Sequence, residues 1–200
     1  MALITTITDR TVELTRRPEI PDITSSAIRT ATLRAHHVDF FPRDLASSIL
    51  SAAPTSLGFT DFQNISTSLP RLRSIKSVQI LDPNSGAPIE QLEYRNTDDL
   101  FTSDGIRRPH VYTLLGDTLR IYSSLPAAST AVFYFQNPNI AGLQYYSWIA
   151  ETYPDEIAAW AAAIVFARTG YAEMANQFQG QHIDPFKDML VASHLLGNVS

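Results

Sequence analysis

The feature that most constrains the fold is the alanine-rich segment PDEIAAWAAAIVFARTG at residues 154–170. Pro154 suits the first turn of a helix, the acidic pair after it complements the positive end of the helix dipole, and Gly170 is suited to end it. The longest apolar run, residues 157–167, is shorter than the roughly 20 residues that cross a bilayer. We therefore expect a core helix that buries one face, formed by residues at helical spacing: Ile157, Trp160, Ala161, Ile164, Val165 and Arg168.

Two helices are predicted ahead of residue 43. The first has Leu3, Ile7 and Leu14 near helical spacing and ends before Pro18. The second begins at Thr24, which is suited to act as its N-cap. Its apolar stripe consists largely of small residues, which allow another backbone to come close: Ala27, Ile28, Ala31, Ala35 and Val38.

Two further helices are predicted after residue 170. One covers residues 171–181, with a buried side formed by Met174, Ala175 and Phe178. Asp184 and Pro185 resemble the N-cap and the first position of a last helix over residues 185–196. Gly180 and Pro185 are therefore expected to interrupt the helical path between the two.

The middle of the chain shows strand periodicity rather than helix periodicity. Turn residues suited to hairpins occur at Asp82–Gly86 and at Gly116-Asp117. Short β-like runs occupy residues 44–53, 72–81, 87–95, 110–115, 118–123 and 130–136. This order predicts an α+β fold, in which N- and C-terminal helices (residues 1–43 and 145–200) form one helical bundle and residues 44–144 form an inserted antiparallel β-lobe.

Composition excludes several classes of protein. The 200 residues are 44% hydrophobic and 18% charged, which is enough for one good core. No cysteine is present, so a disulfide framework, a thiolate metal site and a thiol nucleophile are excluded. The net charge of -5 and the scattered basic residues argue against tight binding of duplex DNA. The first residues lack the layout of a secretory signal peptide, so we expect no export by that route.

Catalytic motifs are also missing from the sequence. It contains no nucleophile elbow, no Walker-type phosphate loop and no dinucleotide fingerprint, and we expect no enzymatic activity, cofactor or bound metal. The strongest catalytic alternative is a small metal-dependent hydrolase that uses His36, His37 and Asp39 with a distant histidine such as His110. Adjacent residues on a helix point about 100° apart. We therefore favour a polar helix end, where protonated imidazoles complement the dipole.

A second alternative is a weak nucleic-acid-binding module on the β-lobe. Its basic residues could form a strip interleaved with Tyr94 and Tyr112: Arg71, Arg73, Lys76, Arg107 and Arg108. A solvated strand face explains the same pattern, and we favour that interpretation.

Several short motifs together resemble one known family. They are Phe-Pro-Arg-Asp at 41–44, GAPIE at 86–90, PHVYTLLGDTL at 109–119 and WIAETYPDE at 148–156. In this order, between N- and C-terminal helices, they resemble the head-to-tail adaptor proteins of tailed bacteriophages. The similarity runs over most of residues 1–196, and its motifs are structural rather than catalytic.

The resemblance implies a ring of about a dozen copies, docked on the portal protein. Such a ring extends the DNA channel in the virion neck, lets DNA pass without specific binding, and offers a platform to the tail or nozzle protein. It also implies that the protein is made in the host cytoplasm, with no membrane contact.

The resemblance further implies that the C-terminal segment, Asp184 to Ser200, reaches the portal. The candidate portal interface is Asp184, Pro185, Phe186, Met189, Leu190, Leu195 and Leu196. The candidate interface to other subunits or to the tail is Arg71, Arg73, Arg107, Arg108 and Tyr112. The sequence departs from the family in one respect, because Gly180 and Pro185 interrupt what is often one long final helix.

Overall fold

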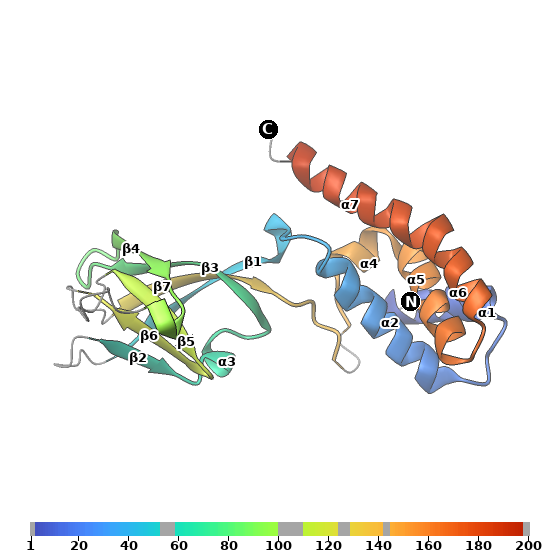
Figure 1. Ribbon diagram of the computed structural model, residues 1–200, viewed down its shortest axis with the longest axis horizontal. Coiled ribbons are helices and arrows are strands. Elements are labelled where there is room, and N and C mark those ends of the chain that lie inside the picture. The colour runs from blue at the N-terminus through green and yellow to red at the C-terminus, as the bar shows by residue number, and fades with distance from the viewer. Residues whose placement is uncertain (1–2, 53–58, 100–109, 124–128, 142–144, 198–200) are drawn as a thin grey trace. The chain divides into compact units, whose positions relative to one another are not determined.

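The computed structural model describes residues 3–52, 59–99, 110–123, 129–141 and 145–197, with the backbone alone at 194–197. It confirms an α+β fold of helices and a β-sheet (Figure 1). The chain divides into two compact units, one formed by Met1–Pro42 with Asn137–Ser200 and the other by Arg43–Gln136. We call them the helical unit and the β unit. Each has its own cluster of buried apolar side chains.

The helical unit is arranged around one central helix. Its helices are α1 (Leu3–Thr15), α2 (Pro21–His36), α4 (Trp148–Thr152), α5 (Pro154–Arg168), α6 (Ala172–Phe178) and α7 (Asp184–Gly197). Helices α1, α2 and α6 pack against α5. Every residue from Ile157 to Phe166 is buried. The expectation of a single buried face on α5 is therefore wrong, because a helix that is apolar all round is covered on several sides.

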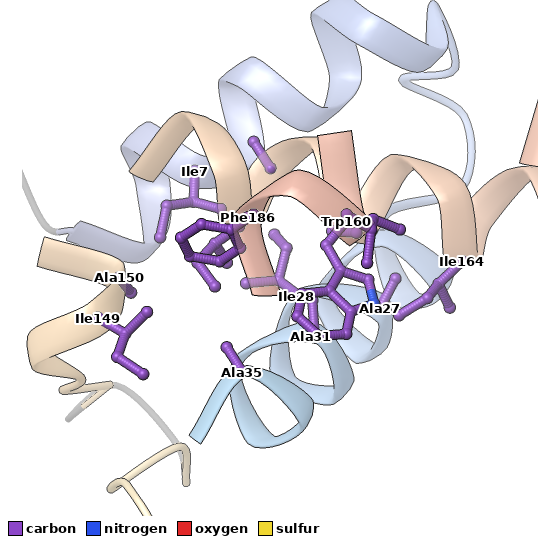
Figure 2. Packing of buried hydrophobic residues seen from close by; sticks show 14 of the residues in the cluster. Ile7, Ala27, Ile28, Ala31, Ala35, Ile149, Ala150, Trp160, Ile164 and Phe186 are labelled. Atoms are coloured by element: carbon purple, nitrogen blue, oxygen red, sulfur yellow. The ribbon is translucent and has the colours of Figure 1, made fainter. Parts of the chain in front are cut away.

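Small side chains allow the close packing of α2 on α5. Ala27 and Ala31 of α2 are fully buried, as the predicted stripe requires. Figure 2 shows them near Trp160 and Ile164 of α5. Burial of large side chains such as Ile28, worth about 1.5–3 kcal/mol each, adds to the stability of this contact.

The buried sides of α1 and α2 differ from the predicted ones in two respects. Leu14 is 43% exposed, whereas Thr11 and Thr15 are buried. Each of these threonine hydroxyls donates to the carbonyl one turn earlier at 2.8 Å, which satisfies it within the core. Thr24 is not the N-cap of α2, because the helix begins at an earlier residue. Its hydroxyl instead donates to the Ile20 carbonyl at 3.1 Å.

The predicted interruption between α6 and α7 is absent. A π-helical segment, Gln179–Ile183, joins the two helices. The backbone N–H of Asp184 donates to the carbonyl of Gln179, five residues earlier. This wider turn carries the helix past Gly180 and Pro185. The predicted buried side of α6 is also wrong at Met174, which is 38% exposed.

The β unit is built on a seven-stranded sheet in the order β1-β7-β3-β4-β5-β6-β2. Its strands are β1 (Leu45–Ser51), β2 (Thr60–Gln63), β3 (Leu72–Leu81), β4 (Pro88–Tyr94), β5 (Val111–Leu115), β6 (Thr118–Tyr122) and β7 (Ser129–Gln136). Each predicted β-like run coincides with one of these strands, although β7 begins one residue before its run. Strand β2 and the short helix α3 (Ile65–Ser68) were not predicted. Gly86 and Gly116 have φ of 70° and 60° at the two predicted turns, as hairpin chemistry requires.

The prediction of a wholly antiparallel sheet is wrong. Strands β4 and β5 pair in parallel, Glu93 with Val111 and Tyr94 with Tyr112. The other pairs are antiparallel. Parallel neighbours cannot be joined by a tight turn, and a long connection, residues 95–110, accordingly separates these two strands.

Candidate interaction surfaces

The candidate portal residues on α7 fall into two groups. Phe186 is 3% exposed and Leu190 is fully buried, so both belong to the core of the helical unit. Asp184 and Pro185 are exposed, and Met189 is 39% exposed. Only this second group lies at the surface. The side chains of the two remaining candidates, Leu195 and Leu196, lie outside the described residues.

Beyond Leu190, helix α7 leaves the core of its unit. Val191 is half-buried, and Ala192 and Ser193 are exposed. The helix nevertheless continues to Gly197. In Figure 1 its C-terminal end stands clear of the other helices of the helical unit. The end of α7 is therefore a helical arm, which we define as residues 191–197.

The basic strip predicted on the β unit is not continuous. The side chain of Arg73 is 8% exposed, and its Nη1 lies 3.4 Å from Oδ2 of Asp44, which is 4% exposed. Arg71 is exposed and donates from Nη2 to Oε1 of Gln136 at 2.9 Å. Arg107 and Arg108 lie outside the described residues. Arg73 therefore forms a buried ion pair rather than part of a surface for nucleic acid.

Tyr112 is a core residue of the β unit and not a surface residue. It is 5% exposed, and its ring lies 5.5 Å from that of Tyr94. Burial, and after it the nearby Tyr94, raises the pKa of its hydroxyl. Tyr94 on β4 is 48% exposed. Of these two tyrosines, Tyr94 and not Tyr112 is therefore available to a partner.

The two adjacent histidines bind different partners. His36 is 1% exposed, its Nε2 lies 2.9 Å from Oγ of Ser147, and its ring meets that of Trp148 edge-on. His37 Nε2 lies 2.8 Å from Oδ1 of Asn137. Asp39 accepts the N–H of the next residue at 2.7 Å. His36 therefore couples the end of α2 to the N-cap of α4, because Ser147 also accepts the N–H of Ala150.

A metal site at these residues finds no support in the geometry. His110 belongs to the β unit, where its Nδ1 contacts a carboxylate oxygen of Glu90. Within the part of the chain that the structure describes, no group of three or more histidine and acidic side chains is placed to hold a metal ion.

A groove that sequence reasoning missed runs between two strands of the β unit. It has a volume of about 400 Å³ and lies between the free edges of β1 and β2. Its lining residues are Ser48, Ile49, Leu50, Ser51, Ala52, Asp61, Phe62, Gln63 and Ser68. The signal in the sequence was LASSILS at 45–51, a strand without charge or proline.

The β2 side of the groove is held by an ion pair. Arg120 on β6 donates from Nε and Nη2 to the two carboxylate oxygens of Asp61, each at 2.7 Å. The same guanidinium lies 4.3 Å from the centre of the Phe59 ring. The hydrogen bonds with Asp61 raise the pKa of Arg120 above its already high ordinary value. The carboxylate in the groove wall is therefore neutralised from within the sheet.

The chain was compared with models of protein families and with curated proteins. No model of a protein family matches the chain, and no curated protein matches it. Among the described residues, no helix combines the length and the apolar character needed to cross a membrane.

Proposed function

We propose that this chain is a structural head-to-tail adaptor subunit of a tailed bacteriophage, without catalytic activity. About a dozen copies form a ring in the virion neck. The ring docks on the portal, extends the DNA channel and offers a platform to the tail or nozzle protein. Each copy is made in the host cytoplasm and binds no cofactor.

The positions of the motifs support this proposal. Residues 41–44 lead into β1, and residues 86–90 lead into β4. Residues 110–119 form most of the β5–β6 hairpin, and residues 148–156 cover α4 and the start of α5. The proposal takes the helical unit as the bundle of the adaptor and the β unit as its inserted lobe.

The observation that carries the proposal is the helical arm. Leu190 anchors α7 in the core, and the described residues after it add little to that core. A helix that continues beyond its own packing gains nothing for the stability of its unit. Such an arm is suited to lie against a second protein, which in an adaptor is the portal.

Exposed apolar side chains of the helical unit supply a second line of support. They include Leu14, Phe40, Tyr146 and Tyr171, each more than a third exposed. Subunits of a ring can bury such residues against their neighbours.

No contact among the described residues favours the two alternatives. His36 and His37 bind different partners, so a hydrolase site is not assembled there. Arg73 is buried in an ion pair, which removes it from a surface for nucleic acid.

The decisive experiment removes the helical arm beyond Ser193 and measures docking to the portal ring. A chain that ends at Ser193 keeps Phe186 and Leu190, so we expect the same thermal unfolding as the full chain. The full chain mixed with portal rings should give a complex that carries about a dozen copies, measured by native mass spectrometry. The shortened chain should give none. Normal docking by a folded shortened chain would contradict the proposal.

A pair of methionines provides a matched control. Met189 on α7 is 39% exposed and Met174 on α6 is 38% exposed. We expect Met189→Lys to weaken docking at least about tenfold, because it places a charge beside the arm. Met174→Lys should leave docking unchanged. Truncation after His182 is a poor test, since it also removes Phe186 and Leu190 from the core.

A further inference from the structure

Two free sheet edges face one another across the groove of the β unit. Among the described strands, β1 pairs with β7 alone and β2 with β6 alone. An edge strand presents unpaired backbone N–H and C=O groups along one side. The groove of about 400 Å³ has both of these edges in its lining.

The two edges differ in how well they are protected. Strand β1 carries no charged residue and no proline, pairs with β7 without a register shift, and leaves Ile49 65% exposed. Strand β2 is shorter, and its Asp61 is held by Arg120. Natural sheets protect long exposed edges with charges, prolines or bulges, or they cover them. Strand β1 has none of the first three. Its Ser48 hydroxyl donates to the Ser68 carbonyl of α3 at 3.3 Å, which covers part of the strand, and a further cover is expected for the rest.

The pairing pattern fixes the direction of a strand that fills the groove. Five antiparallel pairs and the one parallel pair lie between β1 and β2 along the described sheet, so these two edge strands run in opposite directions. A single inserted strand is therefore antiparallel to one edge and parallel to the other. Antiparallel pairing is slightly more stable per residue, and β1 is the longer edge. The inserted strand accordingly runs antiparallel to β1.

The groove wall selects the chemistry of its occupant. None of its lining residues is basic, and its one carboxylate, on Asp61, is already paired with Arg120. Phosphate and nucleic acid therefore find no counter-charge there. Most of the other lining residues are polar and uncharged, whereas Leu50 and Phe62, 6% and 5% exposed, belong to the core cluster beneath the groove.

A second copy of the described sheet is a poor occupant. Each strand of that sheet has a neighbour on at least one side. If a strand of the second copy entered the groove beside β1, the strand next to it in its own sheet would lie about 4.8 Å further on. That position is already occupied by β2. The occupant is therefore an arm that belongs to no sheet of its own.

We propose that this groove binds an extended, uncharged peptide arm of a partner protein as an additional strand, antiparallel to β1. Polar, uncharged side chains of the arm lie against the serine and glutamine side chains of the groove wall. This inference does not rest on the adaptor function, since it follows from the sheet alone.

The test tethers a strand beside the groove of the full chain. The chain has no cysteine, so Ser51→Cys at the end of β1 gives a unique attachment point. The probe is a peptide with the sequence LASSILS, linked through an N-terminal Cys-Gly-Gly so that it runs back antiparallel to β1. A short tether raises the effective concentration to about the millimolar range. We expect the backbone amides of β1 and β2 to exchange with solvent about tenfold more slowly than with the linker alone.

The control peptides separate strand pairing from side-chain contact. In one control peptide the odd-numbered amides carry N-methyl groups, and in the other the even-numbered amides do. A methylated amide cannot donate a hydrogen bond to a neighbouring strand. Both peptides should lose the protection. Equal protection by the methylated peptides, no protection by the original peptide, or protection that depends on protein concentration would each overturn the proposal.

A pair of isoleucines tests the site within the protein. Ile49 on β1 lines the groove, and Ile89 on β4 is comparably exposed at 49% away from it. Ile49→Lys should reduce the protection given by the tethered peptide about two- to fivefold, the size of one cross-strand pair. Ile89→Lys should leave it unchanged, and an equal effect of both substitutions counts against the groove as the binding site.

Discussion

The ring of Phe186 on α7 meets the indole of Trp160 on α5 edge-on, with 6.4 Å between ring centres and 89° between planes. Phe186 also contacts Tyr153, with 5.6 Å between ring centres. Edge-to-face contacts of this kind add to the burial energy of the rings. This pair of contacts attaches the last helix to the central one.

Phe186→Ala should destabilise the helical unit by about 3–5 kcal/mol, because it removes a buried ring and leaves a cavity. Urea unfolding followed by circular dichroism measures the change. Met189→Ala, one turn further along the surface of the same helix, should change stability by less than about 0.5 kcal/mol. Similar losses for the two variants would show that α7 is not held by Phe186.

The buried ion pair of the β unit should behave differently from a surface pair. Asp44→Ala leaves Arg73 charged in a site that is 8% exposed, and should cost about 3–5 kcal/mol. The double variant Asp44→Ala with Arg73→Met should recover a large part of that loss. A double-mutant cycle on unfolding free energies measures the coupling. Additive effects would mean that the two charges do not interact.

Because of Tyr145, we expect the folded chain to lose stability at high pH. Burial raises the pKa of its hydroxyl, against a smaller opposing effect of the hydrogen bond with Thr32 at 2.5 Å. The unfolded chain then ionises this tyrosine before the folded one does. Its contribution to stability is fully present below about pH 10 and is lost as pH rises through the folded pKa.

Two adjacent tyrosines make this effect measurable. Tyr145→Phe should make the stability fall less steeply above about pH 10 than in the unsubstituted chain. Tyr146→Phe, at a residue that is 55% exposed, is the matched removal of a tyrosine hydroxyl outside the core. Tyr112 in the β unit has a raised pKa as well, so part of the fall persists in both variants. Identical slopes for Tyr145→Phe and the unsubstituted chain would contradict the assignment.

Substitution of His36 and His37, one at a time, distinguishes a structural role of these residues from a metal-binding role. His36→Ala should cost about 2–4 kcal/mol, since it opens a cavity beside Trp148 and removes a partner of Ser147. His37→Ala should cost less than about 1 kcal/mol, because its contact with Asn137 is exposed. Thermal unfolding and metal analysis of the purified variants measure both properties. A metal that is bound by the unsubstituted chain and lost from both variants would restore the hydrolase alternative.

The sequence was sufficient for most secondary structure of both units. Alternation in TLRIYS and the glycine turns located β5, β6 and their hairpin, because strand period and positive φ are local properties. The same holds for α5, whose proline and acidic residues fix its start. Strand β2 was missed because TDFQ is too short for its alternation to stand out.

The roles of apolar side chains were harder to predict. Phe186, Leu190 and Met189 lie on one helix, and the sequence alone does not divide that helix into a core face and a surface face. The division depends on α5, which lies distant in the sequence. Tyr112 raises the same difficulty, since its burial depends on the strands that flank β5. Thr11 and Thr15 were missed because a polar side chain can be buried when its own helix satisfies it.

The parallel ladder between β4 and β5 has a consequence for the mechanics of the β unit. It joins two antiparallel halves through the pairs Glu93–Val111 and Tyr94–Tyr112, the shortest ladder in the described sheet. Bending of the sheet concentrates where the fewest hydrogen bonds resist it. A change in the spacing between β1 and β2 that bent the sheet would therefore be concentrated at Tyr94 and Tyr112.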